Sequence, residues 1–359
     1  MPAPTNKSLK VWIGRKRRKA SPVLPGFVAA CLAIITLSGF IHSCDKANDN
    51  PVSVSKAEVL KIYIDKNGTK WAATNGGLLV FKNSKWQTVY NTHVSEKSVN
   101  DLAIEQNIEG PQLWLATCDG ISIVSYEMDE VISATTYSGN EIGFTFNSSQ
   151  SISADKNQTL WIGSMDEITI FKGNIWANPV SAVDTITTIA NDNKGINFVG
   201  TKNSGVEIFT QNADAISSAT VWTKNWSSLK SDAINHILIV DDTCQWYATN
   251  KGVAFHKGYK FKNPDDWENY TTAEGLIGDT VHCAARDLKG VMWFGTPKGI
   301  SVYDKSSNIW TSYTSSDGLI NNQVNTIAID LDGSIWIGTP KGISKFDGVS
   351  FINYDLQMF

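Results

Sequence analysis

One segment recurs along this chain and constrains its fold more than any other feature. Its clearest copy is Val324–Asp347 (VNTIAIDLDGSIWIGTPKGISKFD), and close variants occur from Val59 to the C-terminus. Seven copies, about 44 residues apart, match the length of a four-stranded propeller blade. Each copy contains one aromatic residue on which the copies align: Trp71, Trp114, Trp161, Phe198, Trp246, Trp293 and Trp336. The repeat predicts an all-β protein, a seven-bladed β-propeller of four-stranded blades.

The residue pattern inside each copy favours strands over helical repeats of similar length. Apolar and polar residues alternate with period two, and β-branched and aromatic residues are frequent. Short turns from Asp to Gly join the first two strands, where a calcium loop would need more carboxylates. In the last copy we predict strands at Val324–Ile329, Ser334–Gly338, Gly342–Phe346 and Ser350–Tyr354.

A small residue follows each aromatic residue by two positions. It is Gly or Ala in all seven copies, which indicates that a neighbour approaches closely at this point. The aromatic residues are therefore expected to pack between blades rather than to stack on a ligand. Since the last copy contains all four strands, we expect blade seven to pack on blade one, with Val52–Ser55 as a candidate additional edge strand.

The N-terminus has the composition of a lipoprotein signal peptide. Basic residues precede an apolar run, Phe27–Ile41, which is shorter than the roughly 20 residues of a membrane-spanning helix. The run ends in Ile41-His42-Ser43-Cys44, which resembles a bacterial lipobox, although His42 replaces the usual small residue. An uncleaved membrane anchor is the alternative interpretation.

These features predict the organisation of the chain. We expect a signal peptide over 1–43, lipid on Cys44, a polar tether over 44–56 and the propeller over 57–359. The protein would then be an outer membrane lipoprotein of the cell envelope, facing the periplasm or the cell surface. The lipid anchor would be its contact with the membrane, and we expect a monomer.

Charge and cysteine content argue against several other classes. The net charge is -4, and no basic stripe lies beyond the N-terminus, so nucleic acid is not expected as a partner. Cys118, Cys244 and Cys283 are widely spaced and odd in number, which indicates neither a disulfide framework nor a zinc site. Motifs for a catalytic serine or a phosphate loop do not occur, and we expect no metal or other cofactor.

Blades six and seven resemble the two-component regulator propeller repeat. The resemblance rests on Thr271–Leu276, Thr314–Leu319, Trp310–Tyr313 and the W-I-G-T-x-x-G step, and it extends over Val59–Tyr354. It weakens in blade three, where the Thr-x-x-Gly step is lost, and in blade four, where Phe replaces Trp. The family implies the periplasmic sensor half of Bacteroidetes hybrid two-component systems, which recognises glycan fragments. The repeats are also similar to those of streptogramin B lyase, which implies an enzyme instead.

The loops between second and third strands differ in charge around the ring. Blades four to seven carry lysines there, whereas blades one to three carry Gly76, Asp119 and Asp166. We expect a basic arc that attracts an anionic ligand, such as an acidic sugar, beside polar residues at the mouth of the central channel. The arc consists of Lys202, Lys251, Lys298 and Lys341, and the channel residues are Asn235, His282 and Asn325. Alternatively, Lys is merely a solvated turn residue.

Catalytic groups are sparse in the sequence. A lyase would need a His base near a carboxylate and a metal, and Glu274 and Asp279 precede His282 in one connection. We favour the alternative in which His282 bonds a neighbouring backbone group, and we predict no catalytic residue. Three functions stay open: a module that recognises a glycan or an envelope protein and assists two-component sensing, a lyase acting on a polysaccharide or lactone, and a structural interaction scaffold.

Overall fold

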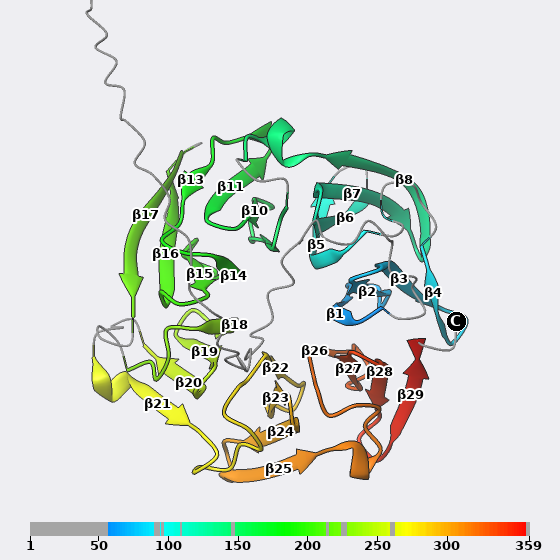
Figure 1. The fold of residues 1–359 in the computed structure, drawn as a ribbon, viewed down its shortest axis with the longest axis vertical. Helices are drawn as coiled ribbons and strands as arrows, with labels where there is room; N and C mark the ends of the chain where they lie inside the picture. Colours follow the sequence, from blue (N-terminus) through cyan, green and yellow to red (C-terminus); the bar gives the residue numbers. More distant parts are fainter. Residues whose placement is uncertain are drawn as a thin grey trace, which may run out of the picture. The chain divides into compact units, whose positions relative to one another are not determined.

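A computed structural model describes residues 57–89, 94, 97–107, 110–144, 148–212, 215–223, 228–258 and 263–356. These residues form seven antiparallel sheets, which surround a central axis as the blades of a propeller (Figure 1). The predicted all-β, seven-bladed fold is therefore confirmed. The expected signal peptide (1–43), Cys44, the tether (44–56) and the candidate strand Val52–Ser55 lie outside the described residues. Within the described part of the chain, no helix has the length and apolarity needed to cross a membrane.

Each blade is built from consecutive strands that run from the axis outward (Figure 1). Blade one contains β1 (Val59–Ile64), β2 (Lys70–Thr74), β3 (Gly77–Lys82) and β4 (Lys85–Thr88), and blade two contains β5 (Val99–Asn107), β6 (Gly110–Thr117), β7 (Gly120–Glu127) and β8 (Glu130–Tyr137). Blade three contains β9 (Ser151–Ala154), β10 (Leu160–Gly163), β11 (Glu167–Lys172), β12 (Ile175–Trp176) and β13 (Val180–Ser181). Blade four contains β14 (Ile186–Asn191), β15 (Asn197–Thr201), β16 (Val206–Asn212) and β17 (Ala215–Trp222).

The remaining three blades follow the same order. Blade five contains β18 (Ile234–Asp241), β19 (Cys244–Thr249), β20 (Gly252–Lys257) and β21 (Trp267–Tyr270), and blade six contains β22 (Cys283–Arg286), β23 (Met292–Thr296), β24 (Gly299–Asp304) and β25 (Ile309–Tyr313). Blade seven contains β26 (Thr326–Ile329), β27 (Ile335–Thr339), β28 (Gly342–Phe346) and β29 (Phe351–Asp355). Short 3-10 helices occur in the connections, at η2 (Gly139–Ile142), η3 (Pro264–Asp266) and η4 (Ser315–Asp317). The predicted strands of blade seven are correct to within two residues.

Blade three departs from the four-strand rule at its outer edge. Its outermost strand is split into β12 and β13, and both pieces pair with β11. Pro179 lies between the two pieces, and a proline cannot donate the backbone hydrogen bond that a continuous strand would need. This is the one blade whose strand number differs from the prediction.

The aromatic residues of the repeat form the core between blades. Trp71, Trp114, Trp161, Phe198 and Trp336 are fully buried, and Trp246 and Trp293 are nearly so. The small residue two positions later is required by the next blade: a Cβ added to Gly338 would lie 2.6 Å from the side chain of Val59. Gly295 has the same relation to Val324, also at 2.6 Å. The prediction that these positions mark close packing between blades is thus confirmed.

The Asp-to-Gly turns lie at the bottom end of the blades, and their carboxylates are used inside the turns. Oδ1 of Asp65 accepts hydrogen bonds from the backbone N–H groups of Asn67 and Thr69, both at 2.8 Å. The same two-bond pattern recurs at Asp155, Asp192 and Asp287. These hydrogen bonds explain why Asp occupies the turns, and they give no support to a calcium loop.

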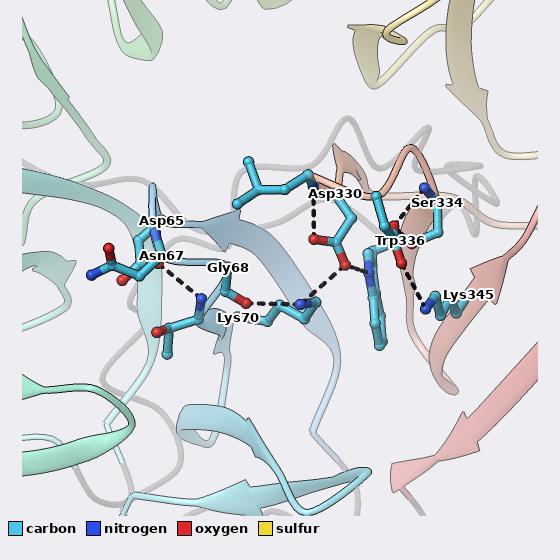
Figure 2. Close-up of polar contacts among 11 residues, drawn as sticks. Asp65, Asn67, Gly68, Lys70, Asp330, Ser334, Trp336 and Lys345 are labelled. Carbon is cyan, nitrogen blue, oxygen red and sulfur yellow. Dashed lines mark hydrogen bonds and ion pairs between the residues drawn. The ribbon is translucent and has the colours of Figure 1, made fainter.

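The ring closes by packing of blade seven against blade one, since no strand is shared between their sheets. The ring centroids of Phe81 and Trp336 are 4.9 Å apart, and those of Trp86 and Trp336 are 5.7 Å apart. At the bottom end, Oδ2 of Asp330 lies 3.0 Å from Nζ of Lys70 and accepts the indole N–H of Trp336 at 2.9 Å (Figure 2). A buried ion pair thus bridges the first and last blades.

Candidate functional site

The innermost strands of the seven blades enclose a central channel. It consists of two adjoining cavities of about 370 and 270 Å³. At its upper end each blade contributes one residue, and together we call them the mouth ring. Its members are Leu60, Asn100, Gln150, Thr187, Asn235, His282 and Asn325. Three of them are the channel residues that the sequence predicted.

Most members of the mouth ring join their blade to the next one. Each donates a hydrogen bond to the backbone carbonyl that precedes the equivalent residue of the following blade. The bonds run from Asn100 to Ser149 (2.8 Å), Thr187 to Ile234 (2.5 Å), Asn235 to Val281 (2.8 Å), His282 to Val324 (2.9 Å) and Asn325 to Val59 (3.0 Å). Leu60 has no donor, and Gln150 contacts Ser148 of its own connection instead. These polar side chains therefore stabilise the ring as well as line it.

A second layer of residues lies one position further along each inner strand. Here side chains accept backbone N–H groups from the next blade: Asp101 from Ile152 (3.2 Å), Ser151 from Ile189 (3.2 Å) and Thr326 from Ile62 (3.4 Å). The inner strands of neighbouring blades are thus linked by side chains in two successive layers. No backbone pairing between these strands is required.

Charged and titratable groups also occur in the second layer. Nζ of Lys61 lies 3.6 Å from Oδ1 of Asp101, and both residues line the two cavities. Burial, together with the nearby Lys61, lowers the pKa of His236 to about 3, so its ring is neutral at physiological pH. Its Nδ1 is buried and has no hydrogen-bond partner among the described residues.

His282 is held by the blade that follows it. Its Nδ1 donates to the carbonyl of Val324, and burial lowers the pKa of the ring despite that bond. The carboxylate of Glu274 instead accepts from the backbone and hydroxyl of Thr271, at 2.6 and 2.7 Å. Asp279 accepts from the backbone of Thr272 at 2.7 Å. The neighbouring carboxylates are therefore used within their loop, and the favoured interpretation of His282 as a backbone-bonded residue matches its geometry.

The four predicted lysines lie on loops at the upper end of the blades, which we call the top face. The loop of Lys298 follows Gly295, whose carbonyl accepts the backbone N–H of His282 at 2.8 Å, so loop and mouth ring share this end. Lys202, Lys251, Lys298 and Lys341 are all exposed, and among the described residues no carboxylate lies within ion-pair distance of them. They do not line the two channel cavities. The structure brings the three channel residues together and leaves the lysines outside them.

The conformation of these loops is fixed by residues other than Lys. In blade six the Thr296 hydroxyl donates to the carbonyl of Gly299 and accepts the backbone N–H of Lys298. Gly299 has a φ of 137°, and a Cβ there would lie 2.4 Å from the carbonyl oxygen of Tyr313. Because Lys298 contributes only its backbone to the turn, its side chain is available to solvent.

Sequence reasoning missed the residues of the second layer. Lys61, Asp101 and His236 stand at one position of the repeat, which is occupied in the other blades by Ser151, Thr188, Cys283 and Thr326. In a repeat whose core aromatic and small residues are strongly constrained, this variation was the available signal. Their relation to one another depends on which inner strands are neighbours, and that follows only from the closed ring (Figure 1).

No group of three or more His, Cys, Asp or Glu residues suited to a metal ion occurs among the residues that the structure describes. The thiol of Cys283 lines the channel, and burial raises its pKa to about 12. It is therefore a protonated wall residue at neutral pH.

Comparison with solved structures identifies similar propellers. The extracellular domain of BT3049 from B. thetaiotaomicron, described as a hybrid two component system, is 24% identical with a TM-score of 0.65, over 83% of this chain and 40% of that one. PorZ of the Porphyromonas gingivalis type-IX secretion system is 14% identical with a TM-score of 0.62, over 83% of this chain and 46% of that one. This chain thus spans less than half the length of either protein.

A third structure is similar over nearly its full length. Virginiamycin B lyase from Staphylococcus aureus, solved in a catalytically inactive form with quinupristin, is 13% identical with a TM-score of 0.59, over 82% of this chain and 97% of that one. At these identities the three likenesses show a shared fold. No curated protein matches the sequence.

A family model matches directly in blade seven. Residues 318–341 match the two component regulator propeller model. They include the Gly-Leu step, the buried Trp336 and the Thr339–Lys341 turn on which the resemblance rested. The chain therefore carries the two-component regulator propeller repeat within a seven-bladed β-propeller.

Proposed function

We propose that this protein is an envelope-anchored recognition module whose top face binds a glycan or a protein partner, as an accessory to two-component sensing. The observation that carries the proposal is the composition of the top face. It combines a polar channel mouth with four exposed lysines that lack carboxylate partners among the described residues. A concave polar site beside unpaired charge of one sign is typical of ligand recognition.

The comparisons support this proposal at the level of fold. BT3049 is described as a hybrid two component system and PorZ as a bacterial surface component, and both use this architecture in extracellular or surface proteins. For this chain, lipid on Cys44 would provide the anchor and the polar residues after it the tether. Mass spectrometry of the protein from its membrane fraction tests the anchor: an intact N-terminus would contradict it.

Binding to a glycan panel tests the role of the lysines. We expect the double variant Lys298→Glu and Lys341→Glu to weaken an acidic ligand by about tenfold or more, because two attractive charges become repulsive. Lys289→Glu is the matched control, since Lys289 is exposed in the bottom turn of the same blade six. Equal affinities for all three proteins would contradict the basic arc.

The same panel separates the other functions. A lyase would shorten the bound polysaccharide or open a lactone, which mass spectrometry of the products detects. A structural scaffold would retain envelope proteins in a crosslinking experiment and bind no member of the panel. Recognition predicts an unchanged glycan that is released intact.

A further inference from the structure

We propose that the bottom face of the propeller is an interface between two copies of this chain, which meet face to face about a two-fold axis. The bottom face consists of the turns between first and second strands and between third and fourth strands, at the opposite end of the blades from the top face. The dimer is therefore independent of the proposed recognition function. The monomer expected from the sequence is the competing outcome.

Two exposed leucines distinguish the bottom turns of blades six and seven. Leu288 and Leu331 follow the Asp of their Asp-to-Gly turns, and they are 70% and 61% exposed. The backbone of the blade six turn is held by the carboxylate of Asp287, so the turn itself does not require Leu. In the other blades whose turn is described, the same position is polar and is occupied by Lys66, Lys156, Asn193 and Asp242.

The two leucines belong to one surface, because each reaches the turn of the following blade. A Cβ added to Gly333 of blade seven would lie 3.7 Å from Cδ1 of Leu288. A Cβ added to Gly68 of blade one would lie 3.6 Å from Cδ1 of Leu331, and Figure 2 shows the turns of blades seven and one side by side. Adjoining exposed apolar side chains mark an interaction surface, whereas single ones are common on any protein.

The positions of the apolar residues suit a second copy of the chain. A two-fold axis that lies in the bottom face and runs between blades six and seven places blade six of one copy against blade seven of the other. Leu288 then meets Leu331 of the partner subunit. Nearer the outer edge, Ile309 and Val349 lie at the turns between third and fourth strands of the same two blades and are 59% and 90% exposed. The same axis places Ile309 against Val349 of the partner subunit.

The charges of the bottom turns are complementary under this symmetry. Lys289 and Asp332 are exposed and follow the two leucines directly, so each Lys289 faces Asp332 of the partner subunit. Blades one and five form the next pair, and their turns carry Lys66 and Asp242 at equivalent positions. A surface that pairs with itself must place basic positions against acidic ones in this way, whereas a surface for a different protein need not.

The charge of Lys289 is available for such a contact. Among the described residues, no carboxylate lies within ion-pair distance of its Nζ. Asp332 contacts Lys345 within its own blade at 3.5 Å, which leaves its exposed carboxylate able to accept a second cation.

Sedimentation velocity of the full-length protein, in a detergent matched in density to the solvent, measures the association. We expect a dimer with a Kd in the micromolar range, as suits a small interface. Leu288→Asp and Leu331→Asp should each weaken it by about tenfold or more, because the symmetry places each change in the interface twice. Lys156→Asp is the matched control, since Lys156 is exposed in the equivalent turn of blade three, across the ring from blades six and seven (Figure 1).

Two charge reversals test the pairing itself. Lys289→Asp and Asp332→Lys should each weaken the dimer by about tenfold or more, because like charges then meet twice. An equimolar mixture of the two single variants should dimerise as the wild type does, because every reversed charge meets an opposite charge on the other variant. A distorted turn would not be rescued by mixing. Circular dichroism and thermal unfolding show which variants are folded.

Three results would overturn the proposed dimer. They are a wild-type protein that stays monomeric up to about 100 µM, folded Leu331→Asp and Lys289→Asp variants that dimerise as the wild type does, and a mixture of the two folded charge variants that stays monomeric. Ligand binding to the top face of a monomer would leave the recognition function intact. Conversely, a dimer whose top face binds nothing would support the interface and contradict the recognition function.

Discussion

At the scale of single residues, the polar side chains of the channel hold the propeller together as well as line it. His282 illustrates this dual role. Its position in the repeat is occupied by Asn100, Asn235 and Asn325 in other blades, and all four donate to a carbonyl of the following blade. His282 therefore acts as a donor of suitable reach, and its imidazole chemistry is not required for the contact.

This equivalence predicts the effect of substitutions at His282. We expect His282→Asn to leave the free energy of unfolding within about 0.5 kcal/mol of wild type, because Nδ2 can replace Nδ1 as donor. His282→Leu should cost about 1–3 kcal/mol, since the carbonyl of Val324 loses its partner. Urea unfolding followed by tryptophan fluorescence measures both. Equal losses for Asn and Leu would contradict this role.

His236 predicts a pH dependence of stability. Its folded pKa of about 3 lies below the value of about 6.5 for an unfolded His. The unfolded chain therefore binds the proton more tightly, and stability is lost as the pH falls below about 6.5. We expect a loss of about 1–2 kcal/mol from this residue between pH 7 and pH 5. His236→Thr, which copies Thr188 and Thr326 of blades four and seven, should reduce the loss, and an unchanged pH profile would refute the assignment.

At the scale of elements, the turns between the second and third strands of blades five, six and seven use one set of residues to fix the backbone and expose another to solvent. In blade six, Thr296 and Gly299 fix the turn between β23 and β24, whereas Lys298 contributes its backbone N–H and an exposed side chain. The same division recurs in blades five and seven. The exposed residues of these turns can consequently vary from blade to blade without loss of the fold.

The turn of blade six makes this division measurable. Gly299→Ala should cost about 2–4 kcal/mol, because Cβ would lie 2.4 Å from the carbonyl oxygen of Tyr313 at a φ of 137°. Lys298→Ala in the same turn should change stability by less than about 0.5 kcal/mol. Thermal and urea unfolding compare the two. A similar loss for both variants would show that Lys298 is a structural residue.

The strands and turns also show how much of the fold could be predicted from the sequence. The sequence predicted the seven aromatic residues of the repeat, the Gly or Ala two positions after each, and the Asp-to-Gly turns. These features were predictable because packing and turn geometry impose the same kind of residue in nearly every copy. The split outer strand of blade three was not, since Pro179 sits in a weakly patterned stretch. The second layer of Lys61, Asp101 and His236 was also missed. Its contacts join residues of different blades, for which local periodicity carries no information.

At the scale of the whole molecule, closure depends on one interface between the two ends of the fold. Val59 packs on Gly338, Phe81 and Trp86 pack on Trp336, and Asn325 bonds the carbonyl of Val59. No strand from one end completes the sheet at the other. Side-chain contacts must therefore supply the stability that a shared strand would otherwise provide.

Lys70 is the residue through which this closure can be tested. Its Nζ lies 3.0 Å from Asp330 Oδ2, and both side chains are largely buried (Figure 2). Lys70→Met should cost about 1–3 kcal/mol, because the Asp330 charge stays buried with, among the described residues, only the indole of Trp336 and a backbone N–H as partners. Lys345→Met is the control, since its pairing with the exposed Asp332 at 3.5 Å should be worth less than about 1 kcal/mol.

Hydrogen exchange shows in which part of the ring the Lys70→Met variant loses stability. If closure depends on this contact, amides of β1 and β27 in Lys70→Met should exchange faster than those of β10 and β15 on the opposite side of the ring, because the ring opens where its ends meet (Figure 1). In Lys345→Met the exchange rates should match wild type. Uniformly faster exchange in all seven blades of Lys70→Met would instead mean that the ring unfolds as one cooperative unit, with no preferred opening point between blades seven and one.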